Sequence, residues 1–72
     1  MTAEKNMITE IGIVAGEIWH YLDEQKQSKV EDLVKSIDRE RNIVLMSLGW
    51  LAREGHVILT EDGKDYKIVL RF

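Results

Sequence analysis

The chain has 72 residues, 44% of them hydrophobic, which is enough for one small core and excludes a separate catalytic domain. Ten lysine and arginine residues are set against thirteen aspartate and glutamate residues, so the formal net charge is −3, and a surface of this average sign repels phosphate at long range. Cysteine is absent, which excludes disulfides, thiolate metal sites and cysteine nucleophiles.

A first helix is predicted over residues 7–22, where apolar side chains recur at steps of three and four. This apolar stripe consists of Met7, Ile11, Val14, Ile18 and Leu22. The polar run at residues 23–27 ends the pattern. We expect the N-terminus, residues 1–7, to be frayed and residues 8–72 to form a single domain.

A second, short helix is predicted from a capping box, in which Ser28 caps the first turn and Glu31 reaches back to it. Its apolar stripe consists of Val30, Leu33, Val34 and Ile37. Asp38 offers another N-cap oxygen ten residues after Ser28, so a third helix should follow after a tight turn. We expect this third helix over about residues 39–54, with Gly55 as the left-handed residue that ends it. Its apolar stripe consists of Val44, Leu48, Leu51 and Ala52.

The apolar period changes to two after the third helix, which predicts strands at residues 57–60 and 66–71. Between them, Asp62 and Gly63 form a strong hairpin signal, because glycine tolerates a positive φ. A further short strand near Gln27 would complete a small sheet. An isolated hairpin is marginally stable in water, so we expect it to pack on the helices through four side chains. These are Val57, Leu59, Tyr66 and Ile68.

Three helices followed by a β-hairpin wing is the element order of the winged helix-turn-helix, an α+β fold. The segment Val44–Val57 resembles the third helix and first wing strand of winged helix-turn-helix proteins. Two clusters, Ile11-Gly12 with residues 15–19 and the Gly-Trp-Leu-Ala-Arg-Glu run at 49–54, resemble more narrowly a group of small prokaryotic winged-helix proteins without an assigned activity. The resemblance covers nearly the whole chain after residue 8. It implies the fold, with DNA binding and a role in transcription as tendencies of the family.

For the double-stranded DNA partner that the resemblance implies, six polar side chains are candidates for contacts to the backbone or bases. They are Lys29, Lys35, Arg39, Asn42, Arg53 and, steadying the wing, Lys64.

The outward face of the predicted third helix is mainly apolar, which argues against DNA binding. A helical wheel puts Ile43, Met46 and Trp50 there, and these offer a base edge no hydrogen bond except the indole N–H. Residues 26–55 hold six cations and five carboxylates, a net charge of +1, which is not a basic patch. The same cations also fit an ordinary solvated helix surface, and both interpretations stay open.

A second surface is predicted from glycines and tryptophans. Gly12 and Gly16 lie one turn apart on the back of the first helix near Trp19, and each costs about 1 kcal/mol relative to alanine in a helix interior. Close approach of another helix or a large ring would explain them, so we hypothesise an interface, most simply a two-fold homodimer. Its candidate residues are Gly12, Gly16, Trp19, Ile43, Met46 and Trp50. The alternative is that both tryptophans are buried within their own chain.

No catalytic, metal or cofactor site is predicted. His20 and His56 have no further ligand residues at metal-binding spacing, and the glycines do not form a phosphate-cradling loop. We therefore expect a non-enzymatic domain without a cofactor, metal or small-molecule ligand. The first six residues lack a signal pattern, and the apolar runs are far shorter than the ~20 residues of a membrane span, so we expect a cytoplasmic protein without a membrane partner.

Overall fold

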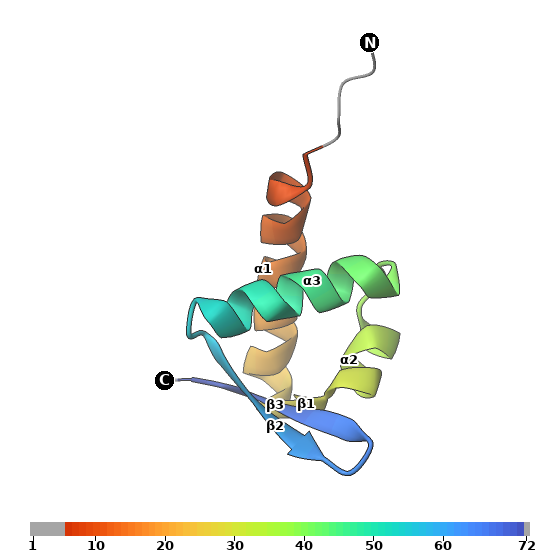
Figure 1. Ribbon diagram of the computed structural model, residues 1–72, viewed down its shortest axis with the longest axis vertical. Coiled ribbons are helices and arrows are strands. Elements are labelled where there is room, and N and C mark those ends of the chain that lie inside the picture. The colour runs from red at the N-terminus through yellow and green to blue at the C-terminus, as the bar shows by residue number, and fades with distance from the viewer. Residues whose placement is uncertain (1–5, 72) are drawn as a thin grey trace.

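The computed structural model describes residues 6–71 as three helices and a three-stranded antiparallel sheet (Figure 1). The elements in chain order are α1 (Ile8–Gln25), β1 (Gln27–Lys29), α2 (Val30–Ser36), α3 (Arg41–Arg53), β2 (Val57–Asp62) and β3 (Asp65–Leu70). The predicted α+β order of three helices and a hairpin is confirmed, as is the short strand near Gln27. In Figure 1, α3 crosses α1, and the sheet lies at the C-terminal end of α1. The first turns of α1 extend beyond α3 on the side away from the sheet.

One hydrophobic core joins the three helices to the inner face of the sheet. Its buried members are Val14, Ala15, Ile18, Leu22, Val30, Leu33, Ile37, Ile43, Val44, Leu48, Leu51, Val57, Ile68 and Leu70. Met7 and Ile11, which begin the predicted stripe of the first helix, are partly buried against this core. The amphipathic stripes of α1 and α3 thus fix how these two helices pack together.

The middle strand of the sheet is β3, which pairs with β1 on one side and β2 on the other. Val57 and Ile68 are buried against the helices as predicted, but the prediction that Leu59 and Tyr66 pack there too is wrong, since both are exposed. Leu59 lies on β2, an edge strand, and Tyr66 lies near the turn of the wing. Neither position is covered by the helices.

Two glycines end elements in the way that the sequence predicts. Gly55 has φ +78° after α3, and Gly63 has φ +65° in the hairpin turn. The first helix ends differently, because α1 continues to Gln25, three residues beyond the predicted end. There Lys26 takes the left-handed conformation, with φ 72°, and its N–H donates to the carbonyl of Leu22 at 2.7 Å.

The predicted caps of the second and third helices are wrong. Ser28 belongs to β1, where it pairs with Ile68, and its hydroxyl donates to the carbonyl of Lys29 instead of capping a helix. Because strand pairing takes Ser28, α2 begins only at Val30, and no side chain caps it. The third helix begins at Arg41, two residues later than predicted, and again without a side-chain cap from Asp38.

Residues 1–5 of the N-terminus that we expect to be frayed lie outside the described residues, whereas residues 6 and 7 make contacts. The N–H of Ile8 donates to Oδ1 of Asn6 at 2.9 Å, and the N–H of Ile11 donates to the carbonyl of Met7 at 2.8 Å. The first bond satisfies a donor that a helix start leaves open, and the second is the first regular backbone bond of α1. Residues 6 and 7 are therefore bonded to the first turn of α1, with Met7 as its N-cap residue.

Candidate functional site

An open groove lies between α1 and the C-terminal half of α3, and we call it the α1–α3 groove. It has a volume of about 270 Å³. Its lining consists of Gly12, Ala15, Gly16 and Trp19 from α1, Trp50 and Leu51 from α3, and His56. The structure thus brings together four of the predicted interface residues from two helices. The sequence placed the glycines on the back of the first helix, whereas α3 in fact flanks them.

Within residues 6–71, no packing contact requires the glycines in this groove. A Cβ atom added at Gly12 or Gly16 would meet no described atom within 4 Å beyond its own stretch of helix, and neither glycine has a positive φ. Glycine inside a helix is less stable than alanine by about 1 kcal/mol. The two glycines therefore weaken α1 without relieving any contact inside the described chain.

Both tryptophans are exposed in residues 6–71, so the crossing of α1 and α3 does not bury them within this part of the chain. Trp19 is 37% and Trp50 46% exposed. Each indole has a histidine beside it. The rings of Trp19 and His20 meet edge-on with centroids 5.7 Å apart, and those of Trp50 and His56 are 6.4 Å apart and tilted by 30°.

The apolar surface extends from the groove towards the start of α1. A neighbouring hollow of about 320 Å³ is lined by Ile8, Ile11, Gly12 and Trp50. Ile8 is 74% exposed and was missed by the sequence reasoning, although it lies four residues before Gly12. That spacing puts Ile8, Gly12 and Gly16 on one face of α1 and could have identified it.

The two remaining interface candidates behave differently from each other. Met46 is exposed on α3, one turn before Trp50. The prediction that Ile43 points outward is wrong, since this side chain is only 6% exposed and belongs to the core. Ser47, one turn later on the same flank of α3, is buried as well, and its hydroxyl is satisfied because it donates to the carbonyl of Ile43 at 2.7 Å.

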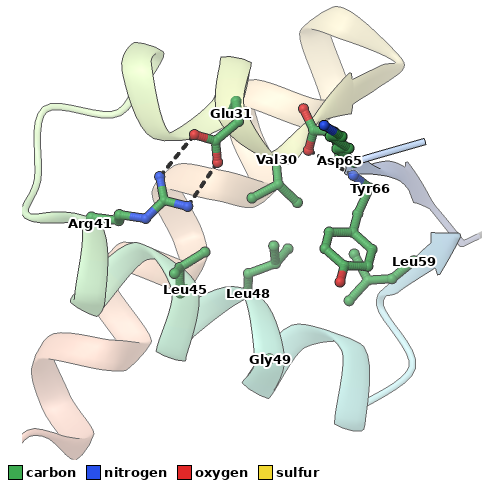
Figure 2. Close-up of a pocket in the computed structure, with 10 residues that line it drawn as sticks. Val30, Glu31, Arg41, Leu45, Leu48, Gly49, Leu59, Asp65 and Tyr66 are labelled. Atoms are coloured by element: carbon green, nitrogen blue, oxygen red, sulfur yellow. Dashed lines mark hydrogen bonds and ion pairs between the residues drawn. The ribbon is translucent and has the colours of Figure 1, made fainter. Parts of the chain in front are cut away.

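A second hollow lies between α3 and the wing, with a volume of about 360 Å³ (Figure 2). Its lining consists of Val30, Glu31, Arg41, Leu45, Leu48, Gly49, Leu59, Lys64, Asp65 and Tyr66. In Figure 2 the guanidinium of Arg41 points at the carboxylate of Glu31, and the ring of Tyr66 lies beside Leu59. The side of α3 that faces the wing is therefore mainly apolar.

Two of the candidate DNA contacts, Arg39 and Lys29, are paired with carboxylates within the chain, and so is a further arginine, Arg41. Arg39 forms a two-point ion pair with Glu17 of α1, at 3.0 Å from Nε and 2.6 Å from Nη2. Lys29 lies 3.6 Å from Asp62 of the wing. Arg41 pairs with Glu31 at 3.0 and 2.8 Å. The hydrogen bonds from these arginines hold the pKa of Glu17 and of Glu31 below the usual range.

The other DNA-contact candidates are exposed and spread over three elements. Lys35 lies on α2, Asn42 and Arg53 lie on α3, and Lys64 lies in the wing turn. No ion pair with another residue in the range 6–71 occupies these three cations. Along α3, Asn42 and Arg53 are separated by Met46 and Gly49 on the same face, so the middle of that face carries no polar side chain.

Neither a metal site nor a membrane-spanning helix is found in residues 6–71. No group of three or more histidine or acidic side chains there could hold a metal ion. Each described helix is too short or too polar to cross a bilayer.

Comparison with known proteins adds to these observations. The family described as "Winged helix-turn-helix domain (DUF2582)" matches residues 1–70. The chain belongs to this family. The domain is also 36% identical over 69 residues to an uncharacterized protein of Methanocaldococcus jannaschii, covering 93% of this chain and 99% of that protein.

A solved structure is similar to the winged helix-turn-helix domain as well. The crystal structure of an ArsR family transcriptional regulator superposes with a TM-score of 0.67, covering 99% of this chain and 77% of that one. The sequence identity is 13%, so the likeness extends to the fold alone.

Proposed function

We propose that this winged helix-turn-helix domain is a non-enzymatic interaction module that joins two copies of itself through the α1–α3 groove. The observation that carries the proposal is the meeting of two exposed indoles and two helix glycines in one open groove. Glycines that weaken a helix without an internal reason are explained when another chain approaches there closely.

The composition of this surface supports a second copy as the occupant. A two-fold interface requires one patch that is complementary to itself. Here the exposed ring of Trp50 lies in the same groove as Gly12 and Gly16, and we call the side-chain-free part of the groove at these two glycines the trough. Under a two-fold axis, each indole would enter the trough of the other copy. Aromatic residues and methionine, such as the neighbouring Met46, are enriched at interface cores.

Trp50→Glu tests the proposal, because it puts a charge into the interface without touching the core. We expect wild-type protein to sediment as a dimer at micromolar concentration and the variant as a folded monomer of about the chain mass of 8.4 kDa. Ile58→Glu is the matched control, since Ile58 is 50% exposed on the sheet face turned away from the helices, and it should stay dimeric. A wild-type protein that is entirely monomeric would refute the proposal.

DNA binding is a second candidate, favoured by the fold that the domain shares with a transcriptional regulator. The supporting side chains are Lys35, Asn42, Arg53 and Lys64, which are exposed and available to phosphates or bases. Against it stand the pairing of Arg39 with Glu17 and the apolar middle of α3. Titration of a random-sequence duplex with the protein at low salt tests this candidate.

A further inference from the structure

The strand β2 forms one edge of the sheet, because β3 lies between it and β1. Along an antiparallel ladder, bonded and non-bonded residue pairs alternate. The N–H of Arg71 donates to the carbonyl of His56 at 2.9 Å, so the bonded pairs fall at every second residue from His56 onwards. The backbone N–H and C=O groups of Val57, Leu59 and Glu61 therefore point away from β3. Within residues 6–71, no hydrogen bond from outside the sheet reaches these groups.

The first four residues of β2 leave this edge open to pairing. Proteins protect edge strands with prolines, bulges, charged side chains or very short strands. Residues 57–60 contain no proline or charged side chain, and β2 keeps a continuous register with β3 over six residues. Three of the four side chains, those of Val57, Ile58 and Thr60, are β-branched and favour an extended conformation. The edge can therefore accept a further strand.

An apolar hollow adjoins the edge on the side of the sheet that faces the helices. Leu59 pairs with the buried Ile68, so the side chains of both residues lie on this face. Leu59 is 40% exposed and lines the hollow between α3 and the wing together with Leu45 and Gly49 (Figure 2). A Cβ atom added at Gly49 would meet open space. An apolar side chain placed beside Leu59 by an added strand would thus lie at the rim of an apolar surface.

The end of the edge near the turn of the wing is acidic. Glu61 is exposed, and the ion pairs of the described chain do not include it. Its side chain lies on the same face as that of Leu59, two residues earlier. Residues directly opposite each other on neighbouring strands have Cβ atoms about 5 Å apart, so opposite charges there attract. An added strand is therefore complementary when it places a cation opposite Glu61.

We propose that the β2 edge binds an extended peptide segment of another protein as a fourth strand. The segment runs antiparallel to β2, with a basic residue opposite Glu61 and an apolar residue opposite Leu59. The backbone of the edge supplies the hydrogen bonds, and the alternate side chains supply the selectivity. None of residues 57–62 lines the α1–α3 groove, so this inference goes beyond the proposed function and does not depend on it.

The experiment titrates a fluorescein-labelled peptide, Lys-Thr-Leu-Thr-Val, with the full chain and follows fluorescence anisotropy. In antiparallel pairing its lysine lies opposite Glu61 and its leucine opposite Leu59. N-methylation of these two peptide residues removes the N–H groups that face β2, and should weaken binding about tenfold. The matched control is N-methylation of the two threonines, whose N–H groups point away from β2, and it should leave the affinity unchanged. Amide hydrogen exchange of Leu59 and Glu61 should slow when the peptide binds.

A charge exchange tests the selectivity without touching the core. Wild type should bind the lysine peptide about fivefold more tightly than the same peptide with glutamate in place of lysine. Glu61→Lys should reverse this preference. Glu24→Lys makes the same change of net charge at an exposed position of α1, and it should keep the preference of wild type.

Several outcomes would overturn the inference. One is an unchanged anisotropy up to about 1 mM protein, the range of a weak complex. Another is equal binding of the two N-methylated peptides, because a peptide that only fills the hollow needs no N–H groups. Self-association that Glu61→Lys abolishes would assign the edge to a second copy instead. Trp50→Glu should bind the peptide as wild type does, so a failure of the proposed dimer and a failure of this inference are distinguishable.

Discussion

At the scale of single residues, the two glycines of α1 are expected to lower the stability of the separate subunit and to favour association of two copies. Gly12 and Gly16 leave open space where alanine would put a methyl group. The lack of a side chain at these positions therefore does not stabilise the separate subunit. A partner that packs over them gains close backbone approach. The same two positions should therefore respond in opposite directions when folding and association are measured separately.

Gly16→Ala is expected to stabilise the monomer by about 0.5–1 kcal/mol, because alanine has the higher helix propensity. The same substitution should weaken the dimer, since the methyl group occupies the trough. Denaturation at a dilute concentration measures the first effect, and sedimentation measures the second. Gly49→Ala is the control, because Gly49 is also a helix glycine with open space but lines the hollow between α3 and the wing. This substitution should change the folding stability and leave dimerisation unchanged. Unaltered dimerisation of the Gly16 variant would argue against close approach at α1.

Two ion pairs connect helices at the scale of elements. Arg39, in the turn between α2 and α3, holds Glu17 of α1, and Arg41 at the start of α3 holds Glu31 of α2. These pairs join the turn of the helix-turn-helix to both neighbouring helices. They also withdraw two arginines from the surface that would meet phosphate, which is why counting cations in the sequence overestimates the free positive charge.

The Glu17 pair predicts a pH dependence of stability. The pKa of Glu17 lies below its ordinary value of 4.5 in the folded chain, chiefly because Arg39 donates hydrogen bonds to its carboxylate. Its contribution is therefore fully present above pH 4.5 and is lost as the pH falls through the lowered value. Glu17→Gln should make thermal stability less sensitive to acid in this range, by a small amount because both side chains are partly solvated. Glu24→Gln removes an exposed carboxylate of the same helix and should leave the acid sensitivity as in wild type. An acid profile unchanged by Glu17→Gln would contradict the predicted contribution of this pair.

Overall charge argues against strong DNA binding at the scale of the whole molecule. The net charge is −3, and near the wing turn Lys64 and Lys67 are offset by Glu61, Asp62 and Asp65. A surface with this balance releases few counterions from a duplex. We expect no binding of a random-sequence duplex at micromolar protein and about 50 mM salt, measured by fluorescence anisotropy. Binding that falls steeply with salt and is weakened in Arg53→Ala would instead favour the DNA candidate.

The local features of this fold were predictable from the sequence. Helical periodicity identified the stripes of α1 and α3, and the need for positive φ identified Gly55 and Gly63. Such features depend on residues that are close together in the chain, so the amino-acid sequence alone is enough to predict them. The wheel also assigned Met46 and Trp50 to the outside of α3, because the surrounding pattern left no other face for them.

The tertiary structure decided what depends on contacts between elements. Pairing with β3 turned Ser28 from a cap into a strand residue, and packing of α3 against the core buried Ile43 together with Ser47. The crossing of α1 and α3 united glycines and tryptophans more than thirty residues apart into one groove and brought His56 to its end. Periodicity reports which way a side chain points from its own helix. Only packing determines which other element it meets there.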